Sequence, residues 1–423
     1  MRRCKWLCLV IVLAMILSAF VGCSKESSPA KPNNPPSVEV NGTLTEYQNI
    51  SVIRMWGTDR EKGFAHGYLL ADYIVNMLDN MIGGGVLGMN AETWENSVIP
   101  AIGLFTIEQR FQEELQGMLA GIQEKLGDSV EVASLGRPLK CEDLTAIQIG
   151  PDFMNVQCSS FSGWGPMTVD SCTITGRNFD WKEIPGVFEK QLVMVYVEEP
   201  GSGRLGFVTI GWPGSLGCFT AMNAEGVTLN INNTNGFPPE ATSGFHPRIL
   251  TYREVVESSH AQTATEDAAA VLRSQKTATP QNLMITMPYT GSNQASVVFE
   301  YDGRYSLDDG ATIREPYSGQ DYQICTNHCR KRKPPINCSR YSLLNAQLDL
   351  IAASEGANHL TLDKAWELLE AVALDNPTHH RVIFEPNKKL MHVALSVVEP
   401  APQRDTVTFS VEELLRGVFE GSD

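Results

Sequence analysis

Apolar residues recur at helical spacing in the first third of the chain and at strand spacing in most of the remainder. Residues 61–74 and 105–126 are apolar every three or four positions, which predicts amphipathic helices in a helical region over 51–157. Segments rich in β-branched and aromatic residues predict strands at 191–197, 205–212, 227–233, 282–286, 295–301, 381–385 and 390–395. Helical periodicity returns in two surface helices, 248–259 and 265–273, and in 342–353 and 362–374. We therefore expect an α+β fold.

One predicted hairpin carries the candidate chemistry. Its first strand begins at Cys158, and its second ends in Gly-Arg-Asn-Phe-Asp at residues 176–180. Alternation along a strand places Arg177 on one face and Asp180 on the other. The hairpin can therefore return an arginine or a carboxylate to the side of the thiol. A buried cysteine with a surface Arg–Asp pair is the alternative interpretation.

The first 50 residues are typical of an exported protein. Residues 1–22 have a basic start and a short apolar run, which predicts a signal peptide, and the small residue before Cys23 predicts lipidation there. Phe20 stands where leucine is usual in that motif, so a plain secreted protein is the alternative. Residues 23–50, rich in proline and serine, are predicted to be a flexible linker. We expect a lipid-anchored protein of the bacterial cell envelope, facing the periplasm or the exterior.

The charge of the chain argues against some partners. With 33 basic and 49 acidic residues the formal net charge is −16, which does not favour nucleic acid as a partner. A local exception is the basic run 330–333, which is either a solvated loop or an anion site. His66, between two glycines near a helix start, is predicted to be structural.

Seven cysteines follow the predicted lipidation site, at 141, 158, 172, 218, 325, 329 and 338. In an oxidising compartment six could pair and leave one free thiol, and a nucleophile must be free. Cys325, His328, Cys329 and Cys338 could also bind zinc, although their spacing fits no common zinc pattern. We expect no metal and no cofactor.

The segment from Cys158 to Asp180 resembles the start of the catalytic chain in N-terminal nucleophile hydrolases. The resemblance is to the choloylglycine hydrolase and penicillin V acylase group and to the acyl-coenzyme A:6-aminopenicillanic acid acyltransferase family, which join a nucleophilic cysteine to a Gly-Arg-Asn-x-Asp signature. In the acyltransferase family self-cleavage exposes the cysteine, which suits an internal Cys158. The resemblance implies a four-layer αββα sandwich and cleavage after Gln157, where many members have glycine. Residues 51–157 would become a small chain that stays associated with residues 158–423.

The resemblance also implies roles for particular residues. Cys158 is the implied nucleophile, and its freed α-amine is the base. Asn232 is the implied oxyanion donor, with Asn233 as the reserve candidate for that role and otherwise a substrate-binding residue. Arg340, in a Ser-Arg-Tyr sequence similar to one in choloylglycine hydrolases, would lower the thiol pKa and hold Asp180 in place.

Three further residues are implied to line the substrate site. The sequence Thr-Asn-His at residues 326–328 is a recurrent signature of the acyltransferase family, and it makes Asn327 and His328 pocket residues. Asn282 is the candidate at the start of a predicted strand.

These features predict hydrolysis of a linear amide in a small-molecule substrate through a thioester acyl-enzyme. Acyl transfer from acyl-coenzyme A is less favoured because that donor is scarce outside the cytoplasm. The alternatives are a non-catalytic surface lipoprotein that uses the fold as a binding module, and a phospholipase B-like enzyme.

Overall fold

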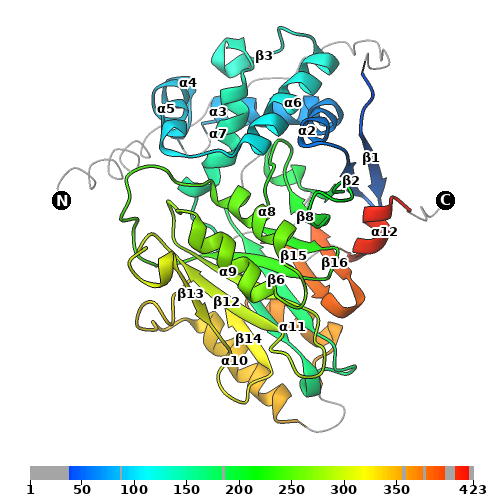
Figure 1. Cartoon of the computed structure of the whole chain (residues 1–423), viewed down its shortest axis with the longest axis vertical. Helices are drawn as coiled ribbons and strands as arrows, with labels where there is room; N and C mark the ends of the chain where they lie inside the picture. The colour runs from blue at the N-terminus through cyan, green and yellow to red at the C-terminus, as the bar shows by residue number, and fades with distance from the viewer. Residues whose placement is uncertain are drawn as a thin grey trace.

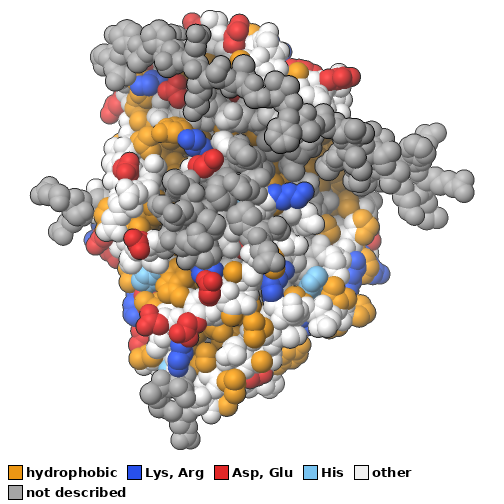
Figure 2. Space-filling view, turned by 180° about the vertical axis from the view of Figure 1, so that it is seen from behind, with side chains coloured by type: hydrophobic (Ala, Val, Ile, Leu, Met, Phe, Trp, Pro, Cys, Tyr) orange, Lys and Arg blue, Asp and Glu red, His pale blue; other side chains and the backbone are white. Residues whose placement is uncertain are grey.

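The computed structural model describes residues 38–85, 88–182, 186–354, 359–374, 378–395 and 405–418. The predicted signal peptide, residues 1–22, and the predicted lipidation site, Cys23, lie outside the described residues. Within these ranges, no helix has the length and apolar character needed to cross a membrane. Acidic, basic and apolar side chains are intermixed on the face drawn in Figure 2.

The described strands form two large sheets and one small one. The larger has the spatial order β1 (Gly42–Tyr47), β2 (Ile50–Met55), β7 (Leu192–Tyr196), β8 (Phe207–Gly211), β9 (Thr220–Asn223), β10 (Thr228–Asn233), β11 (Gln281–Thr286), β12 (Ser296–Tyr301) and β13 (Ala311–Arg314). The second has the order β14 (Tyr322–Cys325), β5 (Gln157–Gly163), β6 (Ile174–Asp180), β15 (Thr378–Glu385), β16 (Leu390–Leu395) and β17 (Val407–Ser410). A short ribbon joins β3 (Glu131–Val132) and β4 (Arg137–Pro138).

The two large sheets pack face to face, and helices cover their outer faces. Alternation along the strands sends Val195 and Met222 of one sheet, and Val382 and Phe384 of the other, into a shared apolar cluster. Helices α8 (Arg248–Ser258) and α9 (Ala264–Ser274) pack on the nine-stranded sheet, and α10 (Ser339–Ala352) and α11 (Leu362–Ala371) on the six-stranded sheet. This arrangement confirms the predicted αββα sandwich.

Residues 59–149 form a helical group at one end of the molecule, at the top of Figure 1. Its helices are α2 (Asp59–Leu69), α3 (Ala71–Gly83), α4 (Ala91–Thr93), α5 (Ile99–Ala101), α6 (Gln109–Leu126) and α7 (Cys141–Ile149), with a π-helical turn at Trp94–Val98. Because this group covers α8, most of α8 is buried, and the prediction that α8 is a surface helix is wrong.

Glycines set the close packing of α2 against α6. A Cβ atom added at Gly63 or Gly67 would overlap the backbone of α6, and one added at Gly117 or Gly121 would overlap the backbone of α2. The four-residue spacing of each pair puts both glycines on one helix face. His66, between the first two glycines, is fully buried and accepts a hydrogen bond from the Gly214 N–H at Nε2 (2.9 Å).

The N-terminal part of the chain also supplies strands. Residues 42–47 of the predicted linker form β1, so the linker prediction over 23–50 extended too far, and β2 is a strand where the region from residue 51 was expected to be helical. These residues pair with β2, and β2 pairs in parallel with β7 through contacts such as Val52 with Val193. At the other end of the described chain, α12 (Val411–Arg416) contacts β7 and β8 and accepts hydrogen bonds from Arg54.

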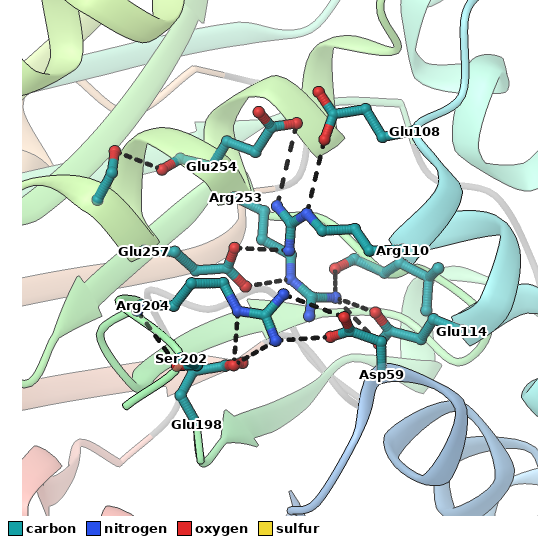
Figure 3. Close-up of polar contacts among 12 residues, drawn as sticks. Asp59, Glu108, Arg110, Glu114, Glu198, Ser202, Arg204, Arg253, Glu254 and Glu257 are labelled. Carbon is teal, nitrogen blue, oxygen red and sulfur yellow. Dashed lines mark hydrogen bonds and ion pairs between the residues drawn. The ribbon is translucent and has the colours of Figure 1, made fainter. Parts of the chain in front are cut away.

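A network of buried charges joins the helical group to the rest of the molecule (Figure 3). Arg253 of α8 donates to Glu114 of α6 (2.8 Å) and to Glu257 (2.7 Å). A second branch links Lys62 of α2 to Glu198 (2.5 Å), which in turn pairs with Arg204 (2.7 Å). Each of these carboxylates therefore lies beside at least one cation.

The seven cysteines at positions 141, 158, 172, 218, 325, 329 and 338 are all free thiols in the structure. The sequence allowed six of them to pair, and the structure contains no disulfide among these seven. Cys329 contacts the hydroxyl of Thr234 at 3.3 Å, and Cys338 contacts that of Thr326 at 3.7 Å. These sulfurs pack against hydroxyl oxygens instead of other sulfurs.

Candidate active site

The β5–β6 hairpin forms as the sequence predicts. The two strands are antiparallel, with Cys158 opposite Phe179 and Gln157 opposite Asp180. The Cys158 side chain is completely buried. Its sulfur and the Arg177 guanidinium lie on the same face of the hairpin, which faces the nine-stranded sheet.

Arg177 holds its guanidinium beside the sulfur. Nη2 lies 3.7 Å from Cys158 Sγ, and Nη1 donates to the backbone oxygen of Ile231 across the sandwich (2.6 Å). Burial raises the pKa of the Cys158 thiol, while Arg177 and Arg340 oppose that rise. In the uncut chain the thiol is therefore neutral near pH 7, and the attacking group needs a base.

The backbone of Cys158 is fixed on both sides. Its N–H donates to Asn327 Oδ1 (2.9 Å), and its carbonyl oxygen accepts from Arg340 Nη1 (2.6 Å). Arg340 also donates to Asn327 Oδ1 (2.9 Å) and to Ser159 Oγ (2.7 Å). The structure thus brings Cys158, Asn327 and Arg340 together, as the site prediction requires.

Asp180 projects from the opposite face of the hairpin. Its Oδ1 accepts from Thr378 Oγ1 (2.7 Å), and its Oδ2 has no hydrogen-bond partner among the described residues. The expectation that Arg340 holds Asp180 in place is not met, because the Arg340 hydrogen bonds go to the backbone and neighbours of Cys158. Burial raises the pKa of Asp180 to about 6.

Asn232 lies at the end of β10 and points into the space between the sheets. Its Oδ1 accepts from Ser160 Oγ (3.4 Å), and its Nδ2 donates to the Cys325 carbonyl (3.3 Å). Both bonds are long, so the amide can turn toward a stronger acceptor at modest cost. Ser160 and Cys158 share one face of β5, which places Asn232 on the side of the sheet that holds the thiol.

Asn233 and Asn327 bind the segment that precedes the thiol. Asn233 Nδ2 donates to the Met154 carbonyl (2.8 Å), and Asn327 Nδ2 donates to the Val156 carbonyl (3.2 Å). Arg248, which no sequence motif singles out, donates to Asn233 Oδ1 (3.0 Å) and to the Met154 carbonyl (3.4 Å). These predicted substrate-binding residues therefore hold the chain's own backbone oxygens.

Asn282 and His328 lie next to Asn327, which hydrogen-bonds to Cys158. Asn282 Nδ2 donates to the backbone oxygens of Thr326 (2.9 Å) and His328 (3.0 Å), so this side chain fixes the loop that carries Asn327. The His328 ring is half-buried, and burial together with Arg340 lowers its pKa. Its Nδ1 has no hydrogen-bond partner in the described part of the chain.

The basic run 330–333 has an internal partner. Backbone N–H groups of Arg330, Lys331 and Arg332 donate to the Glu300 carboxylate, and Arg332 pairs with Asp302 (2.6 Å). The loop thus surrounds a carboxylate of its own chain, as a backbone nest does with an anion. Across the described residues, no three or more histidine, cysteine or acidic side chains gather as a metal site would require.

The chain has an αββα sandwich of the N-terminal nucleophile hydrolase type, and Cys158 lies near the start of β5, the second strand of the six-stranded sheet. A family model described as "Acyl-coenzyme A:6-aminopenicillanic acid acyl-transferase" matches residues 167–390. The match covers more than half of the chain, and the chain belongs to this family. Cys158 itself lies just before the matched residues.

Solved structures similar to this chain include an amidase and a hydrolase by their titles. A Caenorhabditis elegans ortholog of N-acylethanolamine-hydrolyzing acid amidase is 12% identical, with 60% of this chain and 99% of that chain covered and a TM-score of 0.38. A mutant of a conjugated bile acid hydrolase from Clostridium perfringens is 12% identical, with 59% of this chain and 96% of that chain covered and a TM-score of 0.39. Curated proteins give no match to the sequence.

Family membership places the chain among hydrolases and acyltransferases that act on amides. At such low identity and TM-score, the two solved structures do not define a substrate for it.

Proposed function

We propose that the chain is a self-processing cysteine amidohydrolase that cleaves a linear carbon–nitrogen amide bond through a thioester acyl-enzyme. The observation that carries the proposal is the setting of Cys158. Its sulfur lies 3.7 Å from Arg177 Nη2, and its N–H and carbonyl are held by Asn327 and Arg340. The atom that would become the catalytic amine is thus positioned before cleavage.

The first reaction is cleavage of the Gln157–Cys158 peptide bond. The Cys158 sulfur attacks the Gln157 carbonyl carbon, a thioester forms, and the C–N bond breaks with a proton passing to the departing nitrogen. Water then opens the thioester, which leaves a carboxylate on Gln157 and restores the thiol. The freed α-amine, with a reference pKa near 8, then accepts protons at neutral pH better than any carboxylate.

The second reaction uses the same groups on an external amide. The α-amine takes the thiol proton, the thiolate adds to the substrate carbonyl, and the protonated amine gives its proton to the leaving amine. Asn232 Nδ2 donates to the oxyanion that forms on the carbonyl oxygen. Water, deprotonated by the same amine, then attacks the thioester and releases the acid.

Arg177, Arg340 and Asp180 set the charge around these steps. Arg177 stabilises the thiolate directly, because its guanidinium contacts the sulfur. Arg340 donates to the Cys158 carbonyl oxygen and to Asn327 Oδ1, the oxygen that also accepts from the Cys158 nitrogen. Asp180 faces away from the sulfur. Burial raises its pKa, and the charges of Arg340 and Arg177 oppose that rise, so its charge is linked to theirs.

The two self-derived chains are proposed to remain associated after cleavage. The β2–β7 pairing and the ion pairs between Arg253 and Glu114 support this, because each joins the proposed small chain to the large one.

We also propose a lipid anchor at Cys23. Growth with radiolabelled palmitate should label the wild-type protein but not a Cys23→Ala variant, and equal labelling would exclude that site.

Trapping of the acyl-enzyme tests the reaction. Cleaved protein mixed with an N-acyl 4-nitroanilide and quenched in acid should show a large chain heavier by one acyl group, removable by hydroxylamine and located on the peptide that begins at Cys158. Turnover without that adduct would contradict the thioester.

The family's description makes acyl transfer to an amine a second candidate function. An added primary amine should then give a new amide, whereas hydrolysis alone gives only the acid.

A further inference from the structure

Phe179 has no part in the two reactions described above, yet it is the strand neighbour of the candidate nucleophile. It lies opposite Cys158 in the β5–β6 pairing and opposite His380 in the β6–β15 pairing. Residues that lie opposite each other in antiparallel strands project from the same face of the sheet. Cys158, Phe179 and His380 therefore form a row across three strands, on the face that looks toward the nine-stranded sheet.

The Phe179 ring contacts both Arg177 and His380. Its ring and the His380 imidazole are stacked, with 4.9 Å between the ring centroids and 16° between the ring planes. The Arg177 guanidinium lies over the same ring, with Cζ 5.2 Å from its centroid. A cation over an aromatic ring is attracted by the π electrons of its face. The Phe179 ring therefore supports the guanidinium that contacts the sulfur.

Arg177 depends on this support because it has few other contacts. Nη1 donates to the Ile231 carbonyl (2.6 Å), and Nη2 lies 3.7 Å from Cys158 Sγ. Among the described residues it forms no ion pair with a carboxylate, and its Nε has no hydrogen-bond partner. Asp180 is an acidic neighbour, but it projects from the other face of the sheet. The flat Phe179 ring is thus a third contact that defines where the guanidinium lies.

Hydrogen bonds at both ring nitrogens hold the fully buried imidazole of His380. Gln191 Nε2 donates to the His379 carbonyl (2.8 Å), so Gln191 Oε1 faces His380 Nδ1 (2.8 Å) and accepts its proton. Thr220 Oγ1 then donates to Nε2 (2.8 Å). This pattern fixes the neutral imidazole with its proton on Nδ1. Burial, together with the charge of Arg177, lowers the pKa of His380 well below its usual range.

Resting on the proposed function, we propose that His380 is a positioning residue that acts through the Phe179 ring. The stack keeps the Arg177 guanidinium against the sulfur of Cys158, where it stabilises the thiolate. Thr220 belongs to the nine-stranded sheet and His380 to the six-stranded sheet, so the bond between them fixes the imidazole relative to both sheets. A neutral ring suits this position, because a second cation beside Phe179 would repel Arg177.

The pH dependence of Cys158 alkylation tests whether the guanidinium stays in place. The rate of reaction with iodoacetamide follows the thiolate fraction, and mass spectrometry of the Cys158 peptide separates this thiol from the others. His380→Leu removes the stacked ring and both hydrogen bonds, and should raise the midpoint of the profile by about 0.5–1 pH unit. His380→Phe keeps a flat ring and should raise the midpoint by less than half as much.

Two further variants keep the test independent of folding. Thr220→Val removes only the hydroxyl on Nε2 at nearly constant shape, and should shift the midpoint in the same direction as His380→Leu. His392→Leu is the matched control, because this buried histidine of β16 also makes two hydrogen bonds, with Glu385 (2.8 Å) and Thr408 (2.9 Å), but projects from the opposite face of the sheet. Its profile should match the wild type. Equal midpoints in all these variants, or equal shifts in His380→Leu and His392→Leu, would overturn the positioning role.

A double variant tests whether His380 acts through Phe179. In a Phe179→Leu background, His380→Leu should add little further shift, whereas fully additive shifts would overturn this route. Alkylation requires no turnover, so the profile can be measured on cut or uncut protein. The expected shifts in a protein that neither cleaves itself nor hydrolyses amides would overturn the proposed function and leave the effect of the stack on the thiol intact.

Discussion

Two buried arginines on the same helix differ in how their charges are matched. Arg253 lies between Glu114 and Glu257 in the network of Figure 3, whereas the Arg248 guanidinium, at the start of α8, hydrogen-bonds only to neutral oxygens and has Asp152 as an acidic neighbour. Arg177, beside the candidate nucleophile, likewise has a backbone oxygen and a thiol as its contacts. Arg253, which is paired with carboxylates, joins two parts of the molecule. Arg177 and Arg248, which form no ion pair with a carboxylate, lie at or near the candidate active site.

The largest expected effect comes from breaking the matched network. Arg253→Met leaves Glu114 and Glu257 buried without their shared cation, which is expected to cost about 3–5 kcal/mol in the free energy of unfolding. Chemical denaturation measures the change, and the rate per folded molecule should stay within about threefold. Arg416→Met, which removes an exposed pair with Glu412, serves as control and should cost under about 1 kcal/mol.

At Arg177, which forms no ion pair with a carboxylate, we expect a large loss of activity and a smaller loss of stability. Arg177→Met should slow both self-cleavage and amide turnover by about 10²–10³-fold, because the thiolate loses its neighbouring cation. The same change should lower the free energy of unfolding less than Arg253→Met does, since it leaves no buried carboxylate without its paired cation. An Arg177→Met protein that is strongly destabilised but has normal activity would contradict the proposed difference between Arg177 and Arg253.

A smaller effect is expected where the helical group packs without charge. Gly67→Ala puts a methyl group against the Met118 carbonyl, and overpacking of this kind costs about 1–3 kcal/mol. Gly103→Ala is the matched control, because a Cβ atom there meets nothing within 4 Å. Equal melting temperatures for the two variants would show that α2 and α6 do not need their close approach.

The pH dependence of stability sharpens the comparison further. Burial raises the pKa of Asp152 to about 7 from 3.8, with Arg248 opposing that rise. Between about pH 4 and pH 7 the folded chain therefore binds more protons than the unfolded chain, and its free energy of unfolding falls as pH rises. In the uncut Cys158→Ala background, Asp152→Asn should remove this part of the fall. An unchanged pH profile would contradict the raised pKa.

Periodicity predicted most of the fold, because amphipathic helices and β-rich strands leave a local pattern. Strands β2, β13, β14 and β17 and helices α7 and α12 were not predicted, and helix α10 begins at Ser339, three residues before its predicted start. That earlier start matters because it places Arg340 on the first turn of a helix, aimed at the Cys158 carbonyl. Short strands and helix boundaries depend on tertiary contacts that a single sequence does not display.

The residues of the candidate site that lie close together are those whose types form a motif in the sequence. Cys158, Arg177, Asn327 and Arg340 come together as expected, whereas Arg248 was missed because no pattern distinguishes it from a helix-start arginine on the surface. Its contacts with Asn233 and the Met154 carbonyl appear only in the folded structure. The orientation of Asp180 was similarly set by Thr378, almost 200 residues away in the chain.

The state of the Gln157–Cys158 bond tests the central claim most directly. Intact mass and N-terminal sequencing should show two associated fragments in the wild-type protein, the larger beginning at Cys158, and one uncut chain in Cys158→Ala. Wild-type and variant proteins that both remain a single chain would remove the α-amine on which the mechanism depends, and would favour a binding module in place of an enzyme of this type.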